Sequence, residues 1–275
     1  MSVHPWKYLC AIGLLLVMFS CKKDPATTTV VPPGFTFSYG DSVFFLKDQA
    51  EDYIIKPVQA LAGQYSGFPE GIEIDPATGA INVSKSETGL RYRITFLPNG
   101  STDSISTILV ISGINFLDGF YKLTTADSVL RPLYNAGRGA AIPGTGSGTL
   151  FDEGSNCNGA GCTVNVSNGI INLAQTVRNG VFGSTPSNND RHEFLMNYRI
   201  NDKSGKALNS LKVKLYYFDS ITDVTQEAYD IIQSRDGTIF KTNLANNGSA
   251  LNRPFGVAGT KPSKPRPPCI FILAR

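Results

Sequence analysis

Apolar and polar residues alternate along most of the chain after position 34. Runs such as LRYRITFLPNG (90–100) and LKVKLYYFDS (211–220) repeat with a period of two, and Gly, Pro, Asn or Asp separates successive runs. This alternation predicts half-buried β-strands. The runs fall into two groups, so we expect an all-β protein: an Ig-like β-sandwich over residues 35–113, then a second sandwich or jelly-roll-like domain over 118–275.

Two short stretches make sharper predictions about local structure. In IDPATGAI (74–81), Asp75, Pro76 and Thr78 suit a type I turn, and Gly79 can take the left-handed position that follows it, which predicts a hairpin. The run GIINLAQTV (169–177) is expected to be a strand like its neighbours.

One short helix is expected in the second domain. Asp223 can cap it, with Gln226 three residues later. An apolar stripe at helical spacing follows, formed by Val224, Ala228, Ile231 and Ile232.

A hydrophobic run near the amino terminus stops at a cysteine. Leu9 to Phe19 spans about eleven residues, against the roughly 20 that cross a bilayer, and Lys7 is the only charge before it. These features predict a secretory signal. The end of the run, LLLVMFSC (14–21), resembles the lipobox of Bacteroidota lipoproteins, although Met18 and Phe19 depart from its usual residues.

The lipobox resemblance implies a signal peptide over 1–20, acylation of Cys21, and a lipid anchor in the outer membrane with the body facing outward rather than into the periplasm. Residues 21–34 carry three prolines and no apolar periodicity, so we expect an extended tether there. An ordinary secretory signal with an incidental cysteine is the alternative.

Two further stretches resemble known families. FPEGIEIDPATGAINVSKSETGLRYRITF (68–96) resembles the immunoglobulin-like, cadherin-like domains of bacterial surface proteins, with a departure at 82–84. YRINDKSGKALNSLKVKLYYFDS (198–220) resembles Bacteroidota lipoproteins encoded beside SusC/SusD-type uptake pairs. The resemblances imply spacer, adhesive or accessory roles at the outer membrane.

Composition and motifs argue against several kinds of chemistry. The charge is close to balanced, with a net value of +3, so there is no electrostatic reason to expect a nucleic-acid partner, which normally needs a concentrated basic face. HEFLM (192–196) has Met196 where a zinc-protease motif needs histidine, and the glycine-rich 137–148 lacks the P-loop lysine. We therefore expect no metal, no cofactor and no enzymatic activity. Two carboxylate pairs are candidates for catalysis, Asp152 with Glu153 and Asp190 with Glu193, and we interpret both as surface-loop residues.

These observations favour a non-catalytic surface lipoprotein, an accessory or binding module of an outer-membrane uptake or adhesion system. A carbohydrate-binding or carbohydrate-active protein is the alternative, and a structural spacer the third. The only tryptophan, Trp6, lies in the signal peptide, which disfavours a sugar platform. Tyrosines could replace it, and the candidates, which are more typical of strand and core positions, are Tyr134, Tyr198, Tyr216 and Tyr217.

Three cysteines follow Cys21. An oxidising envelope permits disulfides, and CNGAGC closes a tight loop, so we expect a Cys157–Cys162 bond and a buried Cys269 in the last strand. The competing pairing joins Cys269 to one of the other two.

The triplet Asp-Ser-aliphatic occurs four times and resembles the acceptor of the Bacteroidota O-glycosylation system. This resemblance implies glycans on Ser42, Ser104, Ser128 and Ser220. Turn starts before strands generate the same triplet without any sugar.

Overall fold

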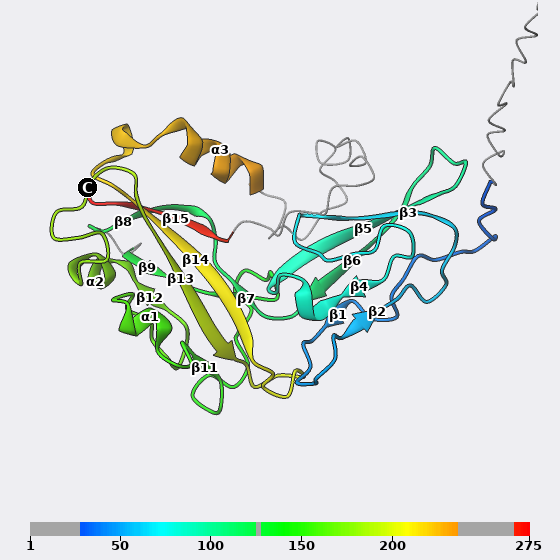
Figure 1. The fold of residues 1–275 in the computed structure, drawn as a ribbon, viewed down its shortest axis with the longest axis horizontal. Coiled ribbons are helices and arrows are strands. Elements are labelled where there is room, and N and C mark those ends of the chain that lie inside the picture. The colour runs from blue at the N-terminus through cyan, green and yellow to red at the C-terminus, as the bar shows by residue number, and fades with distance from the viewer. Residues whose placement is uncertain (1–27, 125–127, 236–266) are drawn as a thin grey trace, which may run out of the picture.

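The computed structural model describes residues 28–124, 128–235 and 267–275. Its regular structure is mostly β-strand in several sheets, which confirms the all-β prediction (Figure 1). The buried apolar residues form one core up to Ile111, another from Ile114 onward, and a smaller cluster on the outer face of the second domain's sheet. The predicted signal peptide and Cys21 lie outside the described residues.

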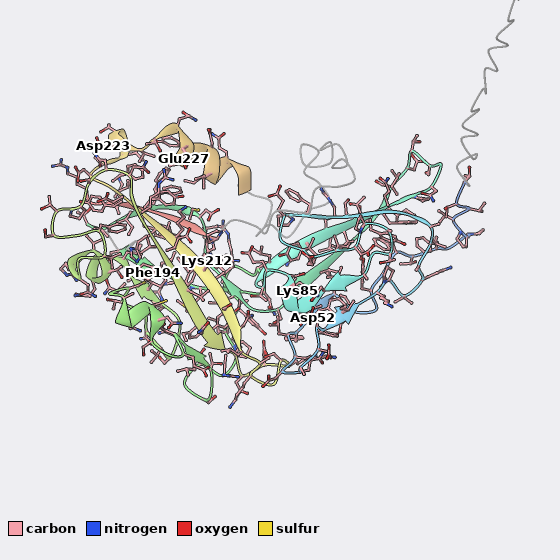
Figure 2. All side chains as sticks on the ribbon, viewed as in Figure 1. Asp52, Lys85, Phe194, Lys212, Asp223 and Glu227 are labelled. Atoms are coloured by element: carbon pink, nitrogen blue, oxygen red, sulfur yellow. The ribbon has the colours of Figure 1, made fainter. Side chains whose placement is uncertain are left out.

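The first sandwich packs a four-stranded sheet against a two-stranded one. The larger sheet has the order β1 (Val43–Phe44), β6 (Ile105–Ile111), β5 (Leu90–Pro98), β3 (Gly63–Phe68), and the smaller pairs β2 (Ile54–Ile55) with β4 (Ile81–Asn82). Alternate β5 side chains, namely Leu90, Tyr92, Ile94 and Phe96, are fully buried between them. A short 3₁₀ helix, η1 (Val83–Lys85), follows β4, and Lys85 pairs with Asp52 at 2.7 Å (Figure 2).

The second sandwich is built on a five-stranded sheet. Its order is β11 (Leu150–Phe151), β13 (Asp190–Arg199), β14 (Asn209–Phe218), β15 (Cys269–Leu273), β8 (Gly119–Lys122). The facing pair is β9 (Val129–Leu130) with β12 (Ile171–Asn172), and β7 (Ile114–Asn115) pairs with β10 (Leu133–Tyr134). The helices are α1 (Asn156–Gly159), α2 (Leu173–Arg178), η3 (Ile221–Asp223) and α3 (Gln226–Arg235).

The second sandwich repeats the turn at the centre of the first, at a constant spacing of 90 residues. In the first, Gly79 N donates to Asp75 O at 2.9 Å; in the second, Gly169 N donates to Asn165 O at 2.8 Å. Both glycines have positive φ, +71° and +72°, and a Cβ there would strike an aromatic ring of the adjoining strand. The predicted hairpin is confirmed, with the Asp75 carboxylate accepting from two turn amides.

The repeat continues past the turn. The side chain of Asn82 caps η1 by accepting from Lys85 N at 3.1 Å, and that of Asn172 caps α2 by accepting from Gln175 N at 2.9 Å. The strand orders also correspond. In the larger sheets, β3–β5–β6 of the first sandwich matches β11–β13–β14 of the second, and in the smaller sheets the pair β2–β4 matches the pair β9–β12. The second domain is therefore a sandwich of the same type, not a jelly roll.

Three local predictions were wrong. Residues 173–178 form helix α2, because the Asn172 cap ends the strand after two residues. The alternating run FTFSYG (35–40), which the same period-two pattern predicts as a strand, forms none, although Phe37 and Tyr39 enter the first core. Helix α3 begins at Gln226. Asp223, which was predicted to cap this helix, is instead the last residue of η3 (Figure 2).

The predicted apolar stripe does face the sheet, although Val224 precedes α3. Ala228 is buried, and Val224, Ile231 and Ile232 pack against the outer cluster of the sheet, which contains Tyr216, Phe218 and Phe271.

The described part of the predicted tether, residues 28–34, contacts the first sandwich. Thr29 N donates to Asn99 O at 2.8 Å and Thr29 Oγ1 to Ala62 O at 2.6 Å, so the chain is bound to the first sandwich from this point. Asn99 follows one end of β5, and Gly89, at the other end, meets the second domain. The second sandwich therefore lies at the end of the first that is remote from the amino-terminal segment (Figure 1).

Candidate functional site

The junction of the two sandwiches is centred on the buried hydroxyl of Tyr198. Strand β13 carries this side chain, which is only 1% exposed, toward the first sandwich. The hydroxyl lies 2.9 Å from Thr88 Oγ1, accepts from Ile114 N at 3.2 Å and from Asn209 Nδ2 at 2.7 Å. Burial raises the pKa of Tyr198 above its ordinary range, so the hydroxyl keeps its proton at neutral pH.

Further polar contacts extend the junction on both sides. Asn115 Nδ2 donates to Glu87 Oε1 at 2.8 Å, and Tyr134 OH donates to Asp202 Oδ2 at 2.7 Å. Ser112 Oγ also donates to Asp202, at 3.3 Å. Burial raises the pKa of Tyr134 to about 12, which keeps this donor protonated as well.

Two glycines let the sandwiches approach this closely. A Cβ on Gly89 would lie 2.3 Å from the carbonyl carbon of Ile114, and one on Gly113 would lie 2.6 Å from the Tyr198 hydroxyl. Both residues also have positive φ, +72° and +149°. Because neither position tolerates a side chain, the sequence itself fixes a close junction.

A small hollow opens beside this network. Its lining includes Leu46 of the first sandwich and Tyr198, Asp202 and Asn209 of the second. The hollow has room for about one water molecule. That is far below the several hundred Å³ of a typical small-molecule site, so the hollow is a structural feature of the junction.

The carboxylates of the two candidate catalytic pairs make structural hydrogen bonds and ion pairs. Asp152 is 3% exposed and accepts from Cys157 N at 2.8 Å and Asn158 N at 2.9 Å. Glu153 forms a 2.6 Å ion pair with Arg199.

The second pair is engaged in the same way. Asp190 accepts from Ser187 N at 2.7 Å, and Glu193 lies within 3.7 Å of Lys212 and Lys214.

His192 lies on strand β13 and not on a helix. Its ring is half-buried and packs on Phe194 at 4.5 Å between centroids. Across the described ranges, no group of three His, Cys, Asp or Glu side chains is placed to hold a metal ion.

The four tyrosines considered as sugar platforms are all buried. Tyr134, Tyr198, Tyr216 and Tyr217 are 8%, 1%, 3% and 7% exposed. Tyr198 holds the junction, Tyr216 lies beneath α3, and Tyr217 packs on Phe182. None of them offers a flat exposed face, so the core interpretation holds for these four residues.

The cysteines are divided by the five-stranded sheet. Cys157 and Cys162 are buried in the inner core of the second sandwich, with their thiols in contact as free cysteines. The contact with Cys162 and burial raise the pKa of the Cys157 thiol. Cys269 is buried on the opposite face, in the cluster beneath α3. The sheet thus separates Cys269 from the other two, which removes the competing pairing.

The four serines of the repeated triplet differ in exposure. Ser42 and Ser104 are exposed, and Ser128 and Ser220 are partly buried. The Ser220 hydroxyl donates to Asp223 Oδ2 at 2.6 Å, which engages it within the η3 turn.

The sequence alone does not predict this junction, because Thr88 and Tyr198 lie 110 residues apart. The available signal was the 90-residue repeat of Asp or Asn, Gly, Asn and Ser or Thr at 75, 79, 82 and 86, which would have identified two equivalent domains.

No family model and no curated protein sequence matches the chain. Among solved structures, it is similar to Drosophila N-cadherin repeats EC1-4, with 13% identity and a TM-score of 0.21, covering 64% of this chain and 46% of that one. The chain is also similar to human protocadherin-24 EC1-2, with 10% identity and a TM-score of 0.22, covering 66% of this chain and 95% of that one.

A SusE-like surface-located polysaccharide-binding protein from the heparin utilisation locus of Bacteroides thetaiotaomicron is also similar. It gives 12% identity and a TM-score of 0.22, covering 69% of this chain and 35% of that one.

Within the described residues, no helix has the length and hydrophobicity needed to cross a membrane.

Proposed function

We propose that this chain is a lipid-anchored, non-catalytic surface protein, which acts as an accessory or binding module of an outer-membrane uptake or adhesion system. Acylation of Cys21 would hold the amino-terminal end at the outer membrane, with the body facing outward. The observation that carries the proposal is the Tyr198 junction. There Thr88 Oγ1 of the first sandwich lies 2.9 Å from the Tyr198 hydroxyl and accepts from Asn209 Nδ2 of the second at 3.1 Å.

A fixed junction matters because domains joined by a flexible linker move independently. Here Gly89 and Gly113 bring the backbones into contact, and Tyr198 bonds both domains. The second sandwich is therefore held at a set orientation, at the end remote from the anchor. A simple spacer has no need of a set orientation, whereas a module that docks on a partner does.

A carbohydrate-binding or carbohydrate-active role has less support from the described residues than the accessory or binding role. The described tyrosines proposed as sugar platforms are buried, and the only tryptophan precedes Cys21. The considered carboxylate pairs serve turns and ion pairs.

Isolation of the tagged protein from native-host membranes in mild detergent tests the proposal. We expect an integral outer-membrane protein to co-purify at a fixed stoichiometry. The matched variant Asn209→Ala keeps the anchor but removes a junction donor, and should recover less of that partner.

The other outcomes contradict the proposal. A partner-free protein whose soluble body binds a defined glycan on an array would support the carbohydrate alternative. A partner-free protein that binds no glycan would support the spacer.

A further inference from the structure

Strand β15 occupies a position that the first sandwich does without. In the first sandwich, β1 pairs directly and in parallel with β6, through Val43 with Val110. In the second, the corresponding strands β8 and β14 are separated by β15, which is parallel to both (Figure 1). A sandwich of this type can therefore pair these two strands directly, and in the second sandwich β15 occupies an additional position, here called the slot, between β14 and β8.

The slot holds β15 through apolar side chains and backbone pairing. Cys269 to Leu273 are each at most 2% exposed. Ile270 and Ile272 enter the inner core, and the other three lie beneath α3. The carboxylate of Asp118 accepts from Cys269 N at 2.6 Å at one end, and Ala274 N donates to Phe218 O at 3.0 Å at the other.

The connection to β15 is far longer than the fold requires. Helix α3 ends at Arg235, and residues 236–266 add 31 positions before Pro267. Connections between a helix and a strand usually have about 2–6 residues. A fully extended chain of 31 residues would span roughly 100 Å, so the number of residues alone does not confine β15 to the slot of its own chain.

We propose that the slot between β14 and β8 also accepts β15 from a second copy of this chain, giving a strand-exchanged dimer. The occupant is chemically identical, so every backbone pair and apolar contact described above is reproduced. Two chains that exchange β15 form a closed, two-fold assembly in which each slot is filled.

Cross-linking between β14 and β15 tests this exchange. Lys214 is the residue partner of Cys269, on the same face of the sheet as Tyr216. The acceptor chain carries Lys214→Cys and Cys269→Ser, and the donor chain keeps Cys269. Both carry Cys21→Ser, so that neither is acylated, and the two are mixed at rising concentration and oxidised.

We expect an interchain disulfide between the thiol introduced by Lys214→Cys and Cys269 of the donor, identified by peptide mapping and increasing with concentration. The matched acceptor Lys212→Cys, with Cys269→Ser, places its thiol two residues along the same strand (Figure 2). That distance exceeds the reach of a disulfide, so this acceptor should give at least tenfold less cross-linked dimer.

The chain with Lys214→Cys and native Cys269 serves as the reference, because it should form the bond within one chain. The proposal would be overturned if the reference chain forms its intrachain bond while the mixture of donor and acceptor yields only monomers at every concentration.

Should the variants fail to fold, native mass spectrometry of mixed ¹⁴N and ¹⁵N wild-type chains decides. Mixed-isotope dimers are expected, and monomers alone would overturn the exchange. A dimer that persists when the intrachain bond locks β15 would overturn it equally.

Discussion

At the scale of single residues, the junction depends on a few buried polar atoms. The Tyr198 hydroxyl lies within hydrogen-bonding distance of Thr88, Ile114 and Asn209 together, and the hollow beside it has room for only about one water molecule. A buried donor or acceptor that loses its partner costs more free energy than the bond itself contributes. Stability at the junction should therefore respond to the removal of one oxygen atom.

Tyr198→Phe should lower the free energy of unfolding by about 1–3 kcal/mol, because it leaves the Ile114 amide and the Asn209 side chain without this acceptor. Chemical denaturation monitored by fluorescence measures the change. The control Tyr53→Phe keeps the ring that lies under Lys47 and should change stability by less than about 0.5 kcal/mol. Equal effects of the two substitutions would contradict the role given to Tyr198.

Non-reducing peptide mapping of the protein from an oxidising envelope should recover a linked peptide that contains Cys157 and Cys162. Their thiols touch in the inner core, and the sheet keeps Cys269 away. The bond closes a short loop and stabilises it by roughly 2 kcal/mol. A linked peptide that contains Cys269 is the contrary result.

Glycan, if attached at the repeated triplet, should be found first on Ser42 and Ser104, whose hydroxyls are exposed. Intact-mass measurement on protein from the native host should show discrete mass steps that disappear in Ser42→Ala and Ser104→Ala. Ser220→Ala should have the smallest effect, since that hydroxyl is engaged by Asp223. A mass equal to the acylated polypeptide alone would rule out decoration.

At the scale of elements, period-two patterns located the long strands β5, β13 and β14 because each has one face in a core. The same pattern failed where an element was too short for periodicity to decide. Residues 169–177 contain a two-residue strand followed by a helix, and the Asn172 side chain sets that boundary. Turn chemistry, rather than apolar spacing, would have separated the two.

Asn172→Ala should lower the free energy of unfolding by about 0.5–2 kcal/mol, because the cap of α2 loses its acceptor for Gln175 N. Asn172→Ser retains a capping oxygen and should recover most of the loss. Thermal or chemical denaturation compares the two variants. Indistinguishable stabilities would show that the cap contributes nothing.

At the scale of the whole molecule, two sandwiches that share a turn, a cap and most of their strand order are joined end to end, and the second has the additional strand β15. The sequence predicted two β domains, but it did not reveal that they are repeats, because only scattered turn and cap residues such as Asp75 with Asn165 correspond. The slot of β15 was equally hidden, since its partners β14 and β8 are far apart along the chain. Long-range pairing of this kind leaves no local pattern to read.

The proposed anchor at Cys21 determines where this rigid body works, and fractionation of native-host cells tests it most directly. The wild-type chain should be found in the membrane fraction with an intact mass that includes acyl groups. Cys21→Ser should leave that fraction or accumulate as the uncut precursor. A Cys21→Ser protein that stays membrane-bound at the normal mature mass would contradict the lipid anchor, and with it the proposed role at the outer membrane.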